Sequence, residues 1–314
     1  MSKHAHEMVK PWPGPALDAE SAWRAILAIR DWIRRNDGIA CGLSVGFPAV
    51  DAEPWVVPGR ADCALVWLHA DGSWSTARPP DRRAALLLDL YMPMCRAAAA
   101  TRTSLVVAHL GQSLDGRIAT VNGSSQWVTG SADIVHTHRM RALADAVLVG
   151  AGTVHHDDPA LTVRHVPGPS PLRVVIDCDR RLDADRKVFT DGAARTLVVC
   201  AEDSIAAGGR TVGQANVLGL PRNGRTLAPS DIVTALVARG VRFLFVEGGG
   251  VTVSRFLQAA CVDRLQLTVA PLLIGSGRPA ISLPVVENIA LGLRPRVRHF
   301  ALDSDVMFEC VFRD

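Results

Sequence analysis

The feature that most constrains the fold is an alternation of strand-like and helix-like segments that begins at Thr103. Short apolar runs predict buried strands, and helical periodicity between several of them favours βαβ units and a mainly parallel sheet. The last two predicted strands are separated by a long irregular stretch, so we expect them to pair antiparallel at an edge. The predicted strands are residues 104–110, 146–150, 172–177, 196–201, 242–247, 264–273 and 305–312, and the predicted helices are residues 132–143, 229–239 and 251–260.

The first hundred residues follow a different pattern. Residues 17–35 predict an amphipathic helix that Asp18 or Ser21 can cap. Two short strand-like runs, 64–70 and 73–77, flank an Asp-Gly pair that favours a tight hairpin turn, and residues 81–100 predict a second helix. We therefore predict a small αβ accessory lobe over residues 1–102 ahead of a larger domain over residues 103–314.

Composition excludes several classes of protein. No apolar run approaches the ~18 residues that span a bilayer, and the N-terminus has no secretory signal pattern, so we expect a cytoplasmic protein without a membrane partner. The net charge is only +3 and the basic residues are scattered, which argues against nucleic acid as a partner. The seven cysteines form no C-x-x-C pair, so neither a disulfide framework nor a thiolate metal site is expected.

Two polar segments follow the first strand of the larger domain. The run Leu-Gly-Gln-Ser-Leu-Asp-Gly at 110–116 predicts a turn; the absence of a side chain at Gly111 would also let a flat cofactor ring approach the backbone. The run Gly-Ser-Ser-Gln-Trp-Val-Thr-Gly-Ser at 123–131 surrounds Trp127 with loop formers. Its indole is either part of the core or lines a pocket.

Two further segments lie where predicted strands end, which is where ligands bind in open α/β sheets. Residues 150–164 include His155-His156-Asp157-Asp158, which is either a helix start or turn built from the two Asp or, less simply, a metal site; we predict no metal. Residues 243–255 read as a strand, three glycines and a helix. Free backbone N–H groups at the start of such a helix favour the binding of a pyrophosphate group.

Taken together, these segments resemble the riboflavin-biosynthesis pyrimidine reductase family, which forms the reductase domain of bifunctional deaminase/reductases. The resemblance covers residues 105–277 and rests on motifs that occur in order. They are Ser-Leu-Asp-Gly at 113–116, Ser-Gln-Trp-Val-Thr-Gly at 125–130, Asp-Ala-Val-Leu-Val-Gly-x-Gly-Thr-Val at 145–154, Asp-Asp-Pro-x-Leu-Thr-Val-Arg at 157–164, Val-Glu-Gly-Gly at 246–249 and Val-Asp-x-Leu-x-Leu-x-x-Ala-Pro-x-Leu-x-Gly at 262–275.

The resemblance implies a dihydrofolate reductase-like fold, a homodimer, and NADPH as the reductant of a phosphorylated pyrimidine, 5-amino-6-(5-phosphoribosylamino)uracil, whose ribosyl group becomes ribityl. The cofactor side would comprise Gly111, Trp127, Thr153, Asp157, Gly249, Gly250, Val251, Thr252, Val253, Ser254 and Arg255. The substrate side would comprise Ser125, Arg141, Leu161, Arg164 and Glu247. Asp157 is the first candidate for orienting or protonating the substrate, and Glu247 is the second.

Two departures from the family pattern stand out. His109 occupies the place of a Lys ahead of the Ser-x-Asp-Gly turn, so its contact with the ribose end of the substrate would differ. The N-terminal lobe lacks the H-x-E and P-C-x-x-C pattern of a zinc deaminase, so no deaminase activity is expected. Arg180 and Arg181 are candidate contacts for the 2′-phosphate of NADPH.

Two other functions stay open at this point. One keeps the fold and NADPH but reduces a pterin, a folate or another heterocycle, because a fold does not fix a substrate. The other is a non-catalytic pyrimidine- or flavin-binding module.

Overall fold

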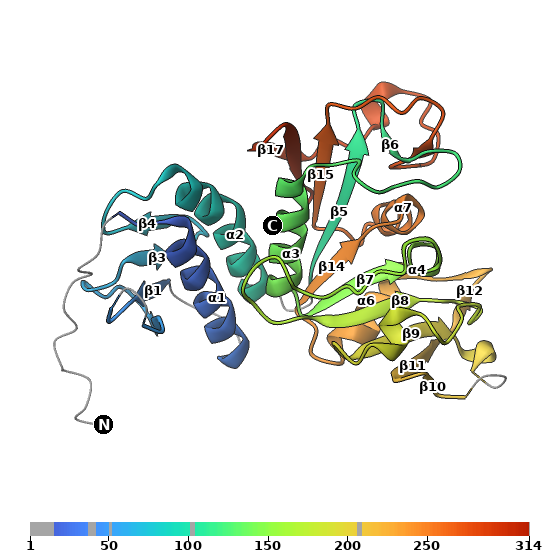
Figure 1. Ribbon diagram of the computed structural model, residues 1–314, viewed down its shortest axis with the longest axis horizontal. Helices are drawn as coiled ribbons and strands as arrows, with labels where there is room; N and C mark the ends of the chain where they lie inside the picture. The colour runs from blue at the N-terminus through green and yellow to red at the C-terminus, as the bar shows by residue number, and fades with distance from the viewer. Residues whose placement is uncertain (1–15, 37–41, 50–51, 101–103, 206–208, 314) are drawn as a thin grey trace. The chain divides into compact units, whose positions relative to one another are not determined.

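The computed structural model describes residues 16–36, 42–49, 52–100, 104–205 and 209–313. The chain divides into two compact units, Met1–Arg102 and Thr103–Asp314. Each unit has its own sheet (Figure 1).

The N-terminal unit is an antiparallel sheet with two helices. Helix α1 (Ala19–Arg35) begins where Asp18 accepts a hydrogen bond from the backbone N–H of Ser21 at 2.8 Å, and it packs against α2 (Arg82–Ala100). The sheet order is β2 (Trp55–Pro58), β1 (Leu43–Gly46), β3 (Val66–Leu68) and β4 (Trp74–Thr76). Strands β3 and β4 are joined through the predicted turn, where Gly72 has a φ of +87°. Strands β1 and β2 were not predicted.

The second unit contains a ten-stranded sheet. Its order is β10 (Thr211–Val212), β11 (Ala215–Leu220), β9 (Thr196–Ala201), β8 (Leu172–Ile176), β7 (Ala146–Gly150), β14 (Phe243–Glu247), β5 (Leu105–Ser113), β15 (Arg264–Ala270), β18 (Asp305–Val311) and β17 (Arg296–Leu302). Pairing is parallel from β11 to β15 and antiparallel from β15 to β17. The predicted fold class, a mainly parallel sheet with an antiparallel edge and flanking helices, is confirmed.

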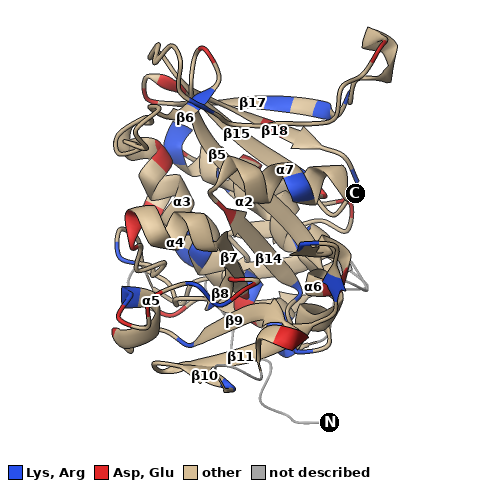
Figure 2. Ribbon diagram, turned by 90° about the vertical axis from the view of Figure 1, so that its right-hand side faces the viewer, with Lys and Arg blue, Asp and Glu red and all other residues tan. Residues whose placement is uncertain are grey.

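Helices cover both faces of this sheet. Helices α3 (Ser131–Leu143) and α4 (Ala151–Asp157) lie on one side of the strands, while α6 (Pro229–Val237) and α7 (Gly250–Gln258) lie on the other (Figure 2). The face under α6 and α7 is apolar: Val106, Ala108, Leu148, Leu244 and Val246 contact Ile232, Leu236, Val253 and Phe256 there. The opposite face carries several buried polar groups, which contribute to the site described below.

The observed elements differ from the predicted ones in a few places. Strand β5 runs on to Ser113, so Gly111 lies in a strand and only Leu114 to Gly116 form the turn. Residues 117–119 add a short strand, β6 (Arg117–Ala119), which pairs with β16 (Arg278–Pro279). Strands β11 and β17 and helix α4 were missed. Strand β17 was missed because its first four residues, Arg-Val-Arg-His, are exposed and give no apolar run.

Candidate functional site

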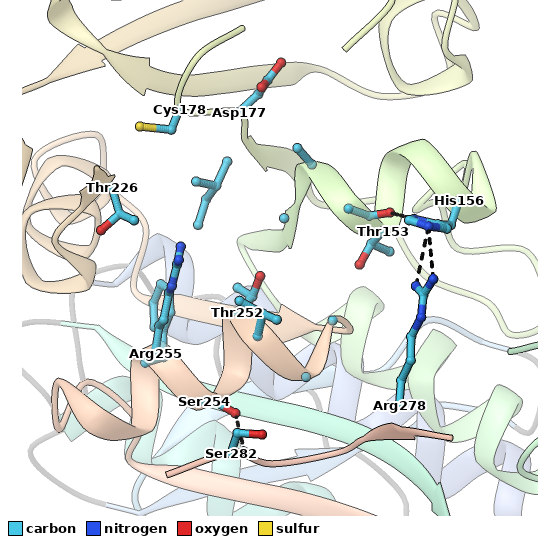
Figure 3. A pocket seen from close by; sticks show the side chains of 18 of the residues that line it. Thr153, His156, Asp177, Cys178, Thr226, Thr252, Ser254, Arg255, Arg278 and Ser282 are labelled. Atoms are coloured by element: carbon cyan, nitrogen blue, oxygen red, sulfur yellow. Dashed lines mark hydrogen bonds between the residues drawn. The ribbon is translucent and has the colours of Figure 1, made fainter. Parts of the chain in front are cut away.

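A cavity of about 870 Å³ opens at the carboxyl ends of β7, β8 and β14 (Figure 3). Helices α4 and α7 begin at its wall, since Gly150 and Gly249 precede them directly. This is the edge at which parallel sheets bind ligands. Further lining segments lie at residues 118–125, 176–181, 225–232 and 278–282.

The turn into α7 is built from glycine. Gly248 and Gly249 have φ angles of +77° and +70°, which L-residues with side chains rarely adopt. A Cβ at Gly250 would lie 2.4 Å from the carbonyl oxygen of Ala280, so only glycine fits there. The turn therefore presents backbone N–H groups to the cavity at a helix N-terminus, an arrangement suited to a diphosphate.

Six of the seven residues predicted in the 249–255 segment line the cavity, and the exception is Val253. Its side chain is fully buried in the apolar core under α7. The reason is helical geometry: residues 253, 256 and 257 share one face of α7, which packs on the sheet. The cofactor assignment of this segment therefore does not extend to the Val253 side chain.

Helix α4 brings three predicted residues together. Asp157 is its last residue, Thr153 lies one turn earlier, and both line the cavity. Ser125, from the loop after β6, donates a hydrogen bond from its Oγ to Oδ1 of Asp157 at 3.1 Å. One predicted substrate residue and the predicted acid thus share one hydrogen bond at the cavity wall.

The histidine and aspartate cluster forms the end of α4 and not a helix start. Asp158 follows the helix with a φ of +40°, and its Oδ1 accepts the backbone N–H of Lys187 at 2.9 Å. His156 lines the cavity, with its Nδ1 2.7 Å from the carbonyl of Gly152 and its Nε2 3.4 Å from Arg278. Within the described residues, no group of three His, Cys, Asp or Glu is arranged to hold a metal ion.

Arg141 and Glu247, both predicted on the substrate side, bind each other between α3 and β14. Arg141 Nε donates to Glu247 Oε2 at 2.7 Å, a second guanidinium nitrogen donates to Oε1, and Nη1 donates to the carbonyl of Thr162 at 3.0 Å. The side chain of Arg141 is only 8% exposed, whereas that of Glu247 is 17% exposed. Arg141 therefore orients Glu247 and the loop after α4, and Glu247 keeps the more accessible face of the pair.

The loop after α4 places the other two predicted substrate residues. Leu161 is buried with a φ of +54°, a strained conformation for a residue with a side chain. Arg164 is exposed, and its backbone N–H donates to His138 Nδ1 at 3.0 Å. Among these substrate-side residues, Arg164 therefore offers an exposed guanidinium on this loop.

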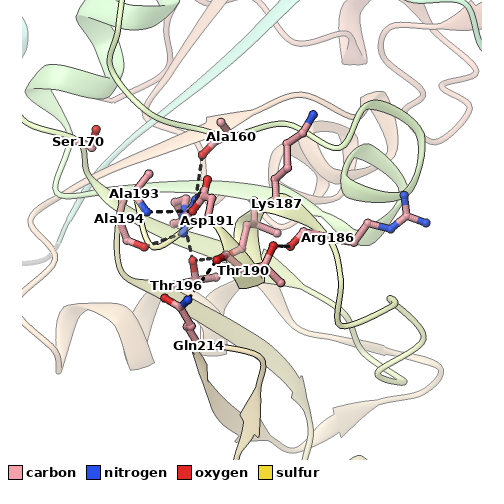
Figure 4. Close-up of polar contacts among 12 residues, drawn as sticks. Ala160, Ser170, Arg186, Lys187, Thr190, Asp191, Ala193, Ala194, Thr196 and Gln214 are labelled. Carbon is pink, nitrogen blue, oxygen red and sulfur yellow. Dashed lines mark hydrogen bonds and ion pairs between the residues drawn. The ribbon is translucent and has the colours of Figure 1, made fainter.

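Arg173 of β8 is buried and donates hydrogen bonds to this loop and to residues after it; Figure 4 labels its partners Ala160, Asp191, Ala194 and Thr196. Its Nη1 donates to the carbonyl of Ala160 at 3.2 Å and to the carboxylate of Asp191 at 2.8 and 2.9 Å. Its other nitrogens donate to Thr196 Oγ1 at 2.8 Å and to the carbonyl of Ala194 at 2.6 Å. A full set of partners at a buried cation makes this cluster a rigid support for the strained loop.

Gly111 and Trp127 do not line the cavity. A Cβ at Gly111 would lie 2.7 Å from Cγ2 of Thr129 and 3.3 Å from the carboxylate of Asp133, so the space left by the missing side chain is filled by the protein itself. Trp127 is 78% exposed with a φ of +66°. Its indole belongs neither to the core nor to the wall of this cavity.

A buried polar layer lies between α3 and the sheet, and sequence reasoning identified only His109 of its members. His109 Nε2 lies 3.4 Å from Asp133 Oδ1, and the hydroxyls of Thr129 and Thr268 donate to the same carboxylate at 2.8 and 2.6 Å. His136 Nε2 lies 2.9 Å from Gln266 Oε1. The inward-facing Gln266 and Thr268 stand two residues apart on β15, and this period-two polar pattern was the available signal.

The charges in this layer are coupled. Burial by itself would lower the pKa of His109, but the neighbouring Asp133 carboxylate, its hydrogen bond and Glu247 outweigh burial and raise that pKa. Burial opposes ionisation of Asp133, yet His109 and the hydroxyl donors hold its pKa well below the usual range. Burial and the His109 charge lower the pKa of His136 to about 3. The 3.4 Å separation and these shifts favour a buried His109–Asp133 ion pair next to a neutral His136.

Several cavity residues were not predicted, including Cys178, Arg225, Thr226 and Arg278. They come from segments that meet only in the folded chain. Of the two arginines proposed near the end of β8, Arg181 lines the cavity and lies 2.9 Å from Asp179, whereas Arg180 donates to the carbonyls of Gly209 and Thr211. Arg180 is thus engaged outside the cavity.

No helix among the described residues combines the length and apolar character needed to cross a bilayer.

Comparisons with known proteins agree with this geometry. A family model described as the RibD C-terminal domain matches residues 104–308. The riboflavin biosynthesis protein RibD of Mycobacterium tuberculosis is 36% identical over 186 residues, which are 58% of this chain and 46% of that protein. The 2,5-diamino-6-ribosylamino-4(3H)-pyrimidinone 5′-phosphate reductase of Methanothermobacter thermautotrophicus is 32% identical over 213 residues, 65% of this chain and 96% of that protein.

A solved Thermotoga maritima deaminase/reductase shares the fold, with a TM-score of 0.62 and 20% identity over 93% of this chain and 99% of that chain. This chain spans about half the length of the curated RibD proteins that it matches. The match to the family model covers most of the second unit and includes the cavity-lining segments described above. The chain therefore belongs to the RibD C-terminal domain family.

Proposed function

We propose that this chain is an NADPH-dependent reductase that converts the ribosyl group of 5-amino-6-(5-phosphoribosylamino)uracil to a ribityl group in riboflavin biosynthesis. The observation that carries this proposal is that one cavity joins the glycine turn at α7 to the Ser125–Asp157 pair at α4. A dinucleotide site and a polar reaction site thus share one wall. The printed names of the relatives, a riboflavin biosynthesis protein and a pyrimidinone 5′-phosphate reductase, support the substrate class.

The residues present fit a nicotinamide dinucleotide. Gly249 and Gly250 offer backbone N–H groups to a diphosphate at the start of α7, while Thr153, Thr252 and Arg255 supply polar groups along the same wall. A Cβ at Gly152 would meet nothing within 4 Å, so this position leaves open space in the cavity wall. When bound, NADPH supplies a hydride for C1′ of the ribosyl group.

The protein's own contribution is orientation and a proton. Opening of the ribose ring leaves an oxygen that must be protonated, and Asp157, fixed through Ser125, is positioned at the cavity wall to orient or deliver that proton. Glu247, held in place by Arg141, is the second candidate carboxylate; it is 17% exposed and is not among the residues that line the cavity. Holding reacting atoms ~3–3.5 Å apart can lower such a barrier by ~7–11 kcal/mol in favourable cases.

Arg164 is proposed to bind the substrate phosphate. Arg164 is exposed and lies on the loop that Arg141 and Arg173 hold through hydrogen bonds to its backbone carbonyls. A guanidinium matches phosphate oxygens in bidentate geometry, and a braced loop limits the entropy lost on binding.

We also propose that the protein is a cytoplasmic homodimer. Apolar side chains stand exposed after β16 and on the edge strands, with Val285 at 94% and Ile289 at 84% exposure. Exposed clusters of this kind mark interfaces between proteins. A measured solution mass of one chain at micromolar concentration would contradict the dimer.

The decisive experiment follows NADPH oxidation with 5-amino-6-(5-phosphoribosylamino)uracil and, separately, with dihydrofolate. We expect turnover of the ribosylaminopyrimidine alone, and a large loss of kcat in Asp157→Asn. Turnover of dihydrofolate alone would identify a pterin or folate reductase. Binding of the pyrimidine without oxidation of NADPH would identify a non-catalytic binding module.

A further inference from the structure

Helix α3 carries a fully buried histidine, His138, that the proposed reaction does not use. Its ring contacts the loop after α4, on which Arg164 lies. The backbone N–H of Arg164 donates a hydrogen bond to Nδ1 of His138 at 3.0 Å. Among the residues that the structure describes, this is the one hydrogen bond that Arg164 makes. A single buried ring therefore fixes the position of the Arg164 backbone.

The loop depends on such fixed points. Residues 158–164 follow α4 without regular secondary structure, and Leu161 is strained at a φ of +54°. The two arginine side chains described above bind carbonyl groups earlier in this loop. Residues 165–170, which come next, are mostly exposed. Arg164 thus lies at the border between the held part of the loop and its exposed continuation, and His138 is its contact at that border.

The hydrogen bond determines which nitrogen of the His138 ring carries the proton. A backbone N–H can only donate, so Nδ1 must carry a lone pair and the proton must lie on Nε2. A protonated ring would carry N–H groups on both nitrogens and would lose this acceptor. Burial lowers the pKa of His138 to about 3, together with the charges of Arg141, Arg164 and His165. The ring is therefore neutral, and the acceptor available, throughout the neutral pH range.

The next residue along the loop contacts the same ring. The rings of His165 and His138 meet edge to face, with centroids 4.5 Å apart and planes at 83°. Such edge-to-face contacts are attractive between aromatic rings. His138 therefore restrains two successive residues of the loop, one through a hydrogen bond and one through ring packing.

We propose that His138 is a positioning residue for substrate binding: its Nδ1 lone pair holds the Arg164 backbone so that the guanidinium is in place for the substrate phosphate. The inference rests on the proposed function, in which Arg164 binds that phosphate. Without the acceptor, the Arg164 N–H is left unpaired against the ring or moves away, and the loop must then be ordered again when the substrate binds. The loss should fall on the substrate, because His138 does not line the cavity.

Three substitutions in the full chain separate the acceptor from the volume of the ring. His138→Asn keeps an acceptor oxygen near the place of Nδ1, His138→Gln places its amide near Nε2, and His138→Phe keeps a ring without an acceptor. We expect His138→Phe and His138→Gln to raise KM for 5-amino-6-(5-phosphoribosylamino)uracil roughly fivefold to a hundredfold, whereas His138→Asn stays within about threefold of the native value. His299→Phe, on exposed strand β17, is the control.

Two further measurements separate positioning from a general structural effect. The kcat and the Kd for NADPH should change less than about threefold in every variant, and retained NADPH binding also shows that each variant is folded. Amide hydrogen exchange reports on the bond without turnover: the Arg164 N–H should exchange at least about tenfold faster in His138→Phe and His138→Gln than in the native chain and in His138→Asn.

A native KM in His138→Phe and His138→Gln, or a loss in His138→Asn equal to theirs, would overturn the inference and leave the proposed function standing. An equal weakening of NADPH binding would overturn it as well, because the effect would then be general. If the native chain does not reduce the pyrimidine, the proposed function fails and this role of His138 fails with it.

Discussion

Replacing His109 with Leu should destabilise the protein by about 3 kcal/mol near pH 6, because it leaves the Asp133 carboxylate buried without its cation. Removing one partner of a buried ion pair costs ~3–5 kcal/mol. The lower end applies here, since the hydroxyls of Thr129 and Thr268 still donate to Asp133 at 2.8 and 2.6 Å. Leu is close to His in volume, so the substitution tests charge more than packing.

The sign of the pH dependence follows from the two pKa shifts. The pKa of His109 is raised above its ordinary 6.5, so its stabilisation is fully present below pH 6.5 and is lost as the pH rises through the folded-state pKa. The pKa of Asp133 is lowered from 3.8, so its stabilisation is present above that value and is lost as the pH falls through the folded-state pKa. The ion pair should therefore contribute most between about pH 4 and pH 6.5.

The assay is urea unfolding of the native chain and of His109→Leu at steps from pH 5 to pH 8.5. The difference in free energy of unfolding should be largest at the acid end and should narrow as the pH rises. His299→Leu, on exposed strand β17, is the control and should show neither effect. A difference below about 1 kcal/mol, or one that does not vary with pH, would refute the assignment of an ion pair.

His109 also bears on substrate binding. The sequence left two interpretations of His109 open: its side chain faces the substrate, or it lies neutral within the strand. In the structure, His109 is only 5% exposed and its ring lies next to Asp133. We therefore expect His109→Lys to leave the pH profile of the substrate constant close to that of the native chain at equal folded fraction. Diverging profiles would show an electrostatic contact with the substrate.

Three further predictions concern the loop after α4 and the division of the chain. Arg164→Ala should weaken the apparent substrate affinity roughly tenfold to a hundredfold by losing a charge-assisted contact, with NADPH affinity unchanged; a matching loss for NADPH would contradict it. Arg173→Met should lower the free energy of unfolding by about 3–5 kcal/mol, because Asp191 stays partly buried without its cation, and a loss below about 1 kcal/mol in urea unfolding would argue against the support role. A shortened chain of residues 103–314 should retain NADPH affinity, since all cavity-lining residues fall between Ile118 and Ser282, and loss of binding by the soluble product would show that the N-terminal unit completes the site.

The sequence predicted the sheet well where strands are continuous apolar runs. Strands β7 and β9 have the predicted bounds, because buried parallel strands carry no polar interruptions to blur their ends. Helix α4 was not predicted because its seven residues are too few to show a helical periodicity of apolar side chains. The antiparallel edge was expected from the irregular stretch ahead of β18, but its outer strand, β17, was not.

The residues of the candidate site were also predicted only in part. Motif residues from three separate segments, Ser125, Asp157 and Gly249, do meet at the cavity. Of residues 249–255, Val253 has its side chain on the buried face of α7, because only one face of the helix borders the cavity. Arg225 could not be identified as a cavity residue from sequence, because nothing in its own turn shows which segments fold around it.

The cavity wall combines two kinds of construction, with different consequences for how its specificity can change over evolution. Its middle is backbone: the Gly248–Gly250 turn, and the Ala280 carbonyl that excludes any side chain at Gly250. Elsewhere the wall is formed by side chains, among them those of Ser125, Asp157, Arg225 and Arg255. Single substitutions can therefore change the side-chain parts of the wall one at a time, while the glycine turn, which no side chain forms, stays the same.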